Sequence, residues 1–358
     1  MNVDPQADDA APVALTRAAD VAGYAPSLEN TQPWRWRVEG DSMRLYAEPI
    51  RQLTASDPGG RLMVFSCGAA LHHARIALAA QGWRINVDRL TEPDRPQLLA
   101  RVRIVGRTEE TQVARRLLRA VHMRQTHPRR VRPIAVERKD IDTIRSAVEA
   151  ERTSLRILNA DAVMELAAAV AAHPRLPSDP QGPPKITQWA ATHRTDWLGD
   201  PHRSVALEPP PTTAADGAAG YPDDPPMNAD NDPGAAVYAI LFGTDDTPAA
   251  WLRAGEAFSA AWLTANDLGV SVLPMSASVE ADATQRILRR ILAGTAEPFL
   301  VLRLGVVDPH HAEAGSAYDS AAFSTDHEDH RPLLTDHLSG ELAEAVVGGS
   351  EQLTLPGP

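Results

Sequence analysis

The chain has 358 residues, 43% of them apolar, which is enough for two domains or for one large two-lobed domain with a substantial core. Its formal net charge of −12 makes nucleic acid and anionic membranes poor partners for the surface as a whole. The sequence contains no apolar run long enough to span a membrane, and its N-terminus lacks the basic and apolar regions of a signal peptide. The expected location is therefore the cytoplasm.

Residues 1–12 are expected to form a flexible tail, followed by a short amphipathic helix over 13–23 with Gly23 as its cap. The next segment, Ala25–Trp36, contains two prolines and several short polar side chains. It cannot continue the helix, because each proline disfavours helical geometry in the residue before it. We expect an ordered bend that offers polar groups to a ligand; a plain turn after a helix end is the alternative.

Apolar residues alternate with polar ones on both sides of Gly40-Asp41, which predicts a β-hairpin. In this hairpin Trp34 and Trp36 face a core, and the arginines between them face the other way. Further along, hydrophobic periodicity predicts helices over 60–81, 109–123, 140–149, 160–172, 252–268 and 284–292, and strands over 101–105, 155–158, 235–242, 270–273 and 299–304. Residues 199–234 are rich in proline and glycine and hold few large apolar residues, so we expect a long loop, either disordered or acting as a lid.

The single cysteine, Cys67, excludes an intramolecular disulfide bond. It stands between Ser66 and Gly68 at the start of an expected helix, where a nucleophile is one interpretation. Buried packing is the more frequent role of a lone cysteine, and we favour it here.

Two stretches of the chain match each other. The helix from Gly68 to Gly82 resembles the helix from Gly255 to Gly269, and each is followed by a strand, a polar linker, a helix and a second strand. The spacing indicates a domain duplication, in which two halves pack about a pseudo-twofold axis as a dimer does. We place the first module at 13–115 and the second at 116–345, with 199–234 as an insertion and 346–358 as a flexible tail.

The two halves differ at two places that concern a binding site. The bend in Ala25–Trp36 occurs only in the first half, and the arginine-rich segment Arg124–Arg130 occurs only at the start of the second. The second half has Ala150–Ser154 in place of the bend. One composite site built from both halves would explain this asymmetry.

In this order and spacing, five motifs resemble the nitroreductase superfamily of flavin proteins, and more narrowly its actinobacterial Acg-type branch of fused tandem modules: Ala25–Trp36, Gly68–Trp83, Arg124–Arg130, Trp251–Ser276 and Arg331–Leu333. The resemblance implies an α+β fold, with two fused nitroreductase-like modules packed as a pseudo-dimer. Each module would have a mixed, mainly antiparallel sheet flanked by helices. FMN would bind between the halves.

The resemblance also implies the residues that bind FMN. Its phosphate dianion needs cations and a hydroxyl, which the family motif assigns to Arg124, Thr126, either Arg129 or Arg130, and Arg331. The flavin ring would be contacted by Pro274, Met275 and Ser276, and covered from the other half by Pro26, Ser27, Leu28 and Asn30. No catalytic side chain is assigned. His327 and His330 have a spacing that suits a metal, but charged surface is the favoured interpretation and no metal site is predicted.

Two functions follow from the resemblance. The first is an FMN oxidoreductase that uses NAD(P)H as a transient reductant and passes electrons to a nitroaromatic or quinone. The chain lacks a Gly-x-Gly-x-x-Gly motif, so NAD(P)H would dock on the flavin itself. The alternative is a protein that stores or sequesters FMN in an occluded site. A third interpretation is a degenerate fold that serves as an interaction module. The expected partners are small molecules, and the fused halves would act as a pseudo-dimeric monomer or assemble further.

Overall fold

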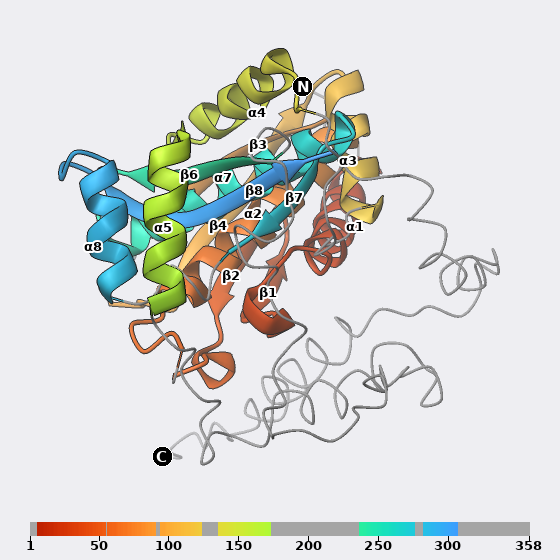
Figure 1. Cartoon of the computed structure of the whole chain (residues 1–358). Coiled ribbons are helices and arrows are strands. Elements are labelled where there is room, and N and C mark those ends of the chain that lie inside the picture. Colours follow the sequence, from red (N-terminus) through yellow and green to blue (C-terminus); the bar gives the residue numbers. More distant parts are fainter. Residues whose placement is uncertain are drawn as a thin grey trace, which may run out of the picture.

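Two four-stranded antiparallel sheets form the framework of the computed structural model, which describes residues 6–54, 56–90, 94–123, 135–172, 236–275 and 282–306 (Figure 1). The first sheet has the order β1-β2-β4-β3, and its strands are β1 (Trp34–Glu39), β2 (Ser42–Ala47), β3 (Trp83–Arg89) and β4 (Leu98–Arg107). The second has the order β5-β6-β8-β7, and its strands are β5 (Ser154–Ile157), β6 (Val237–Gly243), β7 (Ser271–Pro274) and β8 (Glu297–Gly305). The described α-helices are α1 (Gln6–Ala22), α2 (Arg61–Ala80), α3 (Gln112–Met123), α4 (Arg138–Ala150), α5 (Ala160–Ala172), α7 (Pro248–Asp267) and α8 (Asp282–Ile291).

The two halves share one plan. In each, the sheet order follows the same pattern, and a 20-residue helix, α2 or α7, separates the second strand from the third. Each of these helices is followed by a glycine in the left-handed region, Gly82 at φ 71° and Gly269 at φ 73°, where a residue with a Cβ is strained. The register of the second strand also shifts at equivalent places, beside Leu45 in β2 and beside Leu241 in β6. This matched topology supports the predicted duplication.

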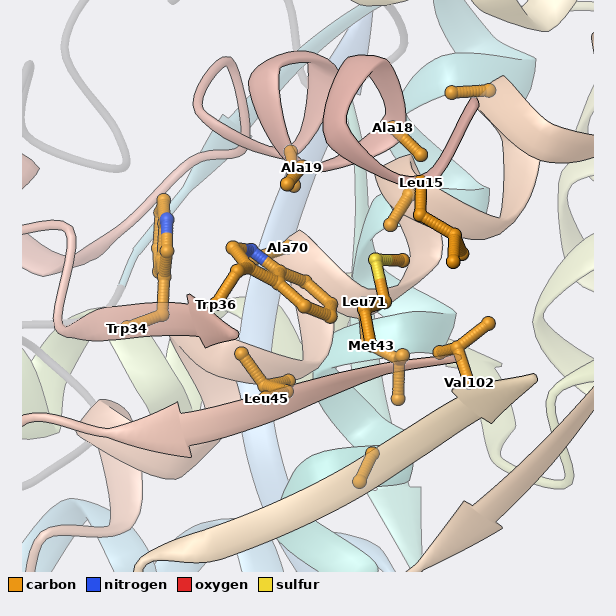
Figure 2. Packing of buried hydrophobic residues seen from close by; sticks show 14 of the residues in the cluster. Leu15, Ala18, Ala19, Trp34, Trp36, Met43, Leu45, Ala70, Leu71 and Val102 are labelled. Atoms are coloured by element: carbon orange, nitrogen blue, oxygen red, sulfur yellow. The ribbon is translucent and has the colours of Figure 1, made fainter. Parts of the chain in front are cut away.

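The predicted hairpin is confirmed. Strands β1 and β2 pair antiparallel around Gly40, whose φ of 56° suits the turn. Trp34 and Trp36 are buried, and Figure 2 shows them under α1, with Met43 and Leu45 of β2 beside Trp36.

Helices occupy the space between the sheets and the outer face of the second sheet. One face of the first sheet packs on α1 and α2 in a single apolar cluster. The second sheet is covered on both faces: α4 and α7 pack on one side, and α5 and α8 pack on the other (Figure 1). Phe65 of α2 belongs to the cluster of the second half and Leu252 of α7 to that of the first, so the two cores interlock along these helices.

Helices α2 and α7 cross at two glycines. A Cβ added to Gly68 would overlap the carbonyl oxygen of Leu252, and one added to Gly255 would overlap the carbonyl oxygen of Phe65. Each added Cβ would also lie 3.0 Å from the Cα of the other glycine. One turn further, the counterparts His72 and Ser259 meet, with His72 Nδ1 2.8 Å from Ser259 Oγ. Residues that the internal match aligns thus touch each other, as expected if the halves are related by a pseudo-twofold axis through this crossing.

The helix α2 is also the described helix that is long and apolar enough to cross a membrane. Of its most apolar window, 78% is buried inside the protein, as in the core helix of a globular fold.

The element boundaries differ from the expected ones mainly at the N-terminus. The first helix was expected to begin at Val13 but begins at Gln6, so residues 6–12 are helical rather than part of a tail. Alanines favour helix there, and Pro12 removes only one backbone donor from a helix whose other face packs on α2. The insertion at 199–234 and the tail at 346–358 lie outside the described residues.

We expect Gly68→Ala and Gly255→Ala each to lower the free energy of unfolding by about 3 kcal/mol, because the new methyl group can fit only if the helix backbones separate. Urea denaturation followed by tryptophan fluorescence measures this. Gly59→Ala is the matched control, since nothing lies within 4 Å of an added Cβ there, and it should stay within about 0.5 kcal/mol of the wild type. Unchanged midpoints for the crossing variants would show that the helices are not in contact at these glycines.

Candidate functional site

The bend is an ordered structure anchored on α2. Residues Leu28–Asn30 form the short 3-10 helix η1. The Leu28 N–H donates to Ser66 Oγ at 3.3 Å, and the Gln32 N–H donates to Ser27 Oγ at 3.0 Å. Gln32 Nε2 reaches back 3.0 Å to the Gly23 carbonyl. The bend is therefore fixed at its start, middle and end.

Two residues of the bend hold a backbone geometry that is unusual for side chains with a Cβ. Asn30 has φ 57° and Gln32 has φ 46°. Such conformations persist only where surrounding contacts enforce them, and they cluster at ligand-binding sites. Here the anchoring hydrogen bonds supply that enforcement. They leave Pro26, Ser27 and Leu28 half-buried and the Asn30 side chain exposed.

Cys67 serves this anchor. Its thiol is fully buried and donates to the Pro33 carbonyl at 3.2 Å, which ties the exit of the bend to α2. Burial raises the pKa of the Cys67 thiol well above its ordinary value, so the thiolate that a nucleophile needs does not form near neutral pH. The packing role favoured from the sequence is the one the structure gives it.

On the second half, the predicted ring-contacting loop begins where β7 ends. Pro274 is half-buried at the end of the strand, and Met275 is buried in the cluster between the second sheet, α5 and α8. The Met275 N–H donates to the Val301 carbonyl at 2.9 Å. This backbone donor is engaged in the sheet, so a donor for a ring nitrogen would have to come from a later residue of the loop.

The remaining predicted site residues lie outside the described residues: Arg124, Thr126, Arg129, Arg130, Ser276 and Arg331. The same holds for His327 and His330. Among the residues that the structure describes, no group of three or more His, Cys, Asp or Glu side chains is placed to hold a metal ion. Between the described residues of the bend and of the end of β7, no hydrogen bond or ion pair is formed.

A buried ion-pair network lies elsewhere on the seam between the halves. Glu256 of α7, with 1% of its side chain exposed, accepts from Arg75 Nη1 at 2.7 Å. It also accepts from Arg89, at 2.8 Å from Nε and 2.7 Å from Nη2, in a bidentate pair. Arg75 Nη1 in turn lies 2.6 Å from Glu151 Oε2. Arg75 and Arg89 belong to the first half and the two glutamates to the second.

This network has a defined relation to the predicted site. Arg89 at the end of β3 and Ser276 after β7 occupy equivalent positions in the two halves. Each lies the same number of residues beyond the glycine that follows the central helix of its half, α2 or α7. Glu151 lies in the short turn between α4 and β5, as the bend lies between α1 and β1. The network therefore joins the pseudo-symmetric counterparts of the two segments that were predicted to face the flavin.

His72 borders the network and is uncharged. Its Nε2 lies 3.9 Å from Glu151 Oε1, a distance at which a charged imidazole would form an ion pair. Burial first, and then the Arg75 guanidinium, lower the pKa of His72 to about 3. We therefore assign the neutral imidazole, held by its hydrogen bond to Ser259.

The sequence analysis did not identify Arg75, Arg89, Glu151 or Glu256. One signal was available: Glu256 interrupts the apolar stripe of its helix where the aligned residue is Ala69, and an acidic residue on a buried face requires a cationic partner. The sequence does not specify which cation pairs with Glu256, because Arg89 belongs to a strand in the other half, far away in the chain.

Comparisons with known proteins were made for the whole chain. No protein-family model matches it. The chain is 32% identical over 292 residues to "Putative NAD(P)H nitroreductase Rv3131" of Mycobacterium tuberculosis H37Rv, which covers 80% of this chain and 83% of the relative. It is 29% identical over 303 residues to "Putative NAD(P)H nitroreductase acg" of the same organism, with 82% and 88% covered. A solved structure, the FMN-dependent nitroreductase NfnB of Mycobacterium smegmatis in complex with NADPH, matches with a TM-score of 0.37 at 15% identity over 57% of this chain and 93% of that one.

The buried neutral His72 predicts a pH dependence of stability. Its pKa is lowered in the folded chain from 6.5 to about 3, so between these values the unfolded chain binds a proton that the native chain does not. Stability conferred by this site is thus complete above pH 6.5 and falls by up to about 1.4 kcal/mol per pH unit as the pH drops.

His72→Gln should flatten this acid slope while keeping a polar partner for Ser259. Urea unfolding at a series of pH values measures it. His122→Gln, at an exposed histidine, is the control and should change the slope less. Equal slopes for wild type and His72→Gln would mean that His72 is protonated in the native state.

Proposed function

Because this chain belongs to the nitroreductase family, we propose that it is an FMN-dependent oxidoreductase with a single composite flavin site between its two halves. NAD(P)H is the proposed reductant, since the relative with 32% identity is named for it. When bound, FMN supplies the electron-transfer chemistry. The chain's own residues hold it, orient it and limit the access of water.

The observation that carries the proposal is the pairing of segments across the seam. The bend belongs to the first half and the β7 loop to the second, and their counterparts, Glu151 and Arg89, are joined through Arg75 and Glu256. A pseudo-twofold relation of the halves through the α2–α7 crossing would bring the bend and the loop to a comparable separation. This supports a site whose walls come from both halves.

The described residues fit a flavin ring. Pro26, Ser27 and Leu28 present a half-buried and mainly apolar surface, and the bend is held by hydrogen bonds to α2 and within itself. A wall that is ordered in advance loses little entropy on binding. Asn30 is exposed and offers an amide that can both donate and accept. We assign the phosphate to Arg124, Thr126, Arg129 or Arg130, and Arg331.

The alternative is an FMN-sequestering protein with little turnover. The feature that favours it is the insertion at 199–234, whose length and proline content suit a lid. If the insertion covers the flavin, deletion of residues 203–232 should speed the reaction of the holoprotein with NAD(P)H and acceptor. A deletion that changes neither the rate of flavin reduction by NAD(P)H nor the rate of reoxidation by the acceptor would argue against a lid.

We expect the purified protein to be yellow, and we expect NADPH or NADH added without oxygen to bleach the flavin band. A nitroaromatic or quinone should then restore it. Absorbance at the flavin maximum follows both steps. Bleaching by dithionite but by neither NADPH nor NADH would contradict the oxidoreductase and favour the FMN-sequestering protein. A colourless protein that takes up no FMN would exclude both functions.

Arg124→Ala and Arg331→Ala should each weaken FMN binding about 10- to 100-fold, since each removes a charge-assisted hydrogen bond to the phosphate. Fluorescence titration of FMN into the apoprotein measures this. Arg145→Ala is the control, because its guanidinium pairs with Asp142 on the exposed face of α4. Unchanged affinity in both test variants would indicate an interaction module rather than a flavoprotein.

A further inference from the structure

A twofold arrangement of halves creates two equivalent positions on the seam, and the proposed flavin site accounts for one of them. We propose that the second position is occupied by the protein's own carboxylates: Glu256 and Glu151 act there as built-in ligands of Arg75 and Arg89. That position then binds no second flavin and instead clamps the two halves together. This inference rests on the proposed function, because the proposed site defines which position is the second one.

The clamp has the geometry of a ligand held by arginines. Glu256 binds Arg89 through two parallel contacts of 2.7 and 2.8 Å, the arrangement by which arginine recognises a carboxylate or phosphate. The same carboxylate receives Arg75 at 2.7 Å. Glu151, with 12% of its side chain exposed, closes the outer edge through Arg75. Two positive and two negative groups leave the cluster neutral, so no charge remains to attract a phosphate.

The aligned residues explain why the two positions differ. Glu256 is aligned with Ala69 and Arg89 with Ser276, so the residues that fill the second position have small counterparts at the first. A phosphate at the second position would also need cations from the start of the first half, as Arg124–Arg130 supply them from the start of the second. Residues 1–12 contain aspartates and no lysine or arginine. Both differences act against a second flavin.

A remnant of the second position persists as a cleft of about 510 Å³. Its lining includes His72, Arg75, Arg89 and Glu151, and most of the other lining residues are apolar, such as Ile85. This volume is within the range of small-molecule sites, but its polar groups are engaged with each other. Burial alone would lower the pKa of Arg75, yet Glu256 and Glu151 outweigh it and raise that pKa, so this guanidinium stays charged and bound.

The test removes the built-in ligands one at a time. Glu256→Gln leaves two arginines facing a neutral amide, and we expect the Tm to fall by about 5 °C or more. Glu151→Gln, at the outer edge of the cluster, should lower the Tm by less. It replaces Glu256→Gln in the test if that variant fails to fold. Asp142→Asn, which breaks an exposed pair on α4, is the control and should leave the Tm nearly unchanged. A Tm of Glu256→Gln equal to that of the control would overturn the clamp.

A second readout separates built-in ligands from an ordinary structural ion pair. Each glutamine variant should gain thermal stability from millimolar inorganic phosphate at constant ionic strength, beyond any gain of the wild type, because the released arginines can now bind it. If phosphate raises the Tm of neither variant by more than it raises that of the wild type, the carboxylates do not act as built-in ligands.

Flavin content distinguishes this inference from the proposed function. FMN released by denaturation and measured against protein should give one FMN per wild-type chain. Two per chain would overturn the inference and the single flavin site, and would leave the proposed FMN-dependent oxidoreductase activity standing. None would overturn the proposed function, while the Tm and phosphate measurements still decide whether the carboxylates clamp the halves.

Discussion

The arrangement of the molecule depends on the contact between α2 and α7 at Gly68 and Gly255. Each glycine leaves open the space into which the carbonyl oxygen of the other helix projects. Backbones can approach this closely only where no Cβ stands between them. The crossing fixes the distance between the helices, and with it the positions of the two sheets that pack outside them. Residues that the internal match aligns touch there, so the proposed twofold relation of the halves would pass through this crossing and define two equivalent positions on the seam.

The two proposed positions carry different residues. At one, an ordered bend with half-buried, mainly apolar side chains and an exposed amide is anchored to α2. At the other, four charged side chains from both halves satisfy one another. Buried charges are costly unless they are paired and hydrogen-bonded, and this network meets that condition. A single chain can vary the two positions independently, which a homodimer cannot do because one sequence builds both.

The bend shows how the core serves the proposed site. Ser66 and Cys67 are buried on α2 and hydrogen-bond to Leu28 within the bend and to Pro33 near its exit. The strained backbone at Asn30 and Gln32 is held by these contacts and by the hydrogen bond from Gln32 to Gly23. A cysteine that the sequence left open to a reactive role is thus a support for a binding surface.

The sequence by itself determined the local structure and the matching of the halves. Alternation around Gly40 gave the hairpin with Trp34 and Trp36 in the core, and the glycines that follow the two central helices marked their ends, because these features depend on neighbouring residues. Only the tertiary structure decided that Gly68 meets Gly255, that Glu256 finds Arg89, and that the Met275 N–H is engaged in the sheet. These contacts join residues far apart in the chain, and nothing in the local pattern of either partner specifies the other. The glycine contact, for example, follows from how closely two helix backbones can approach where no Cβ stands between them.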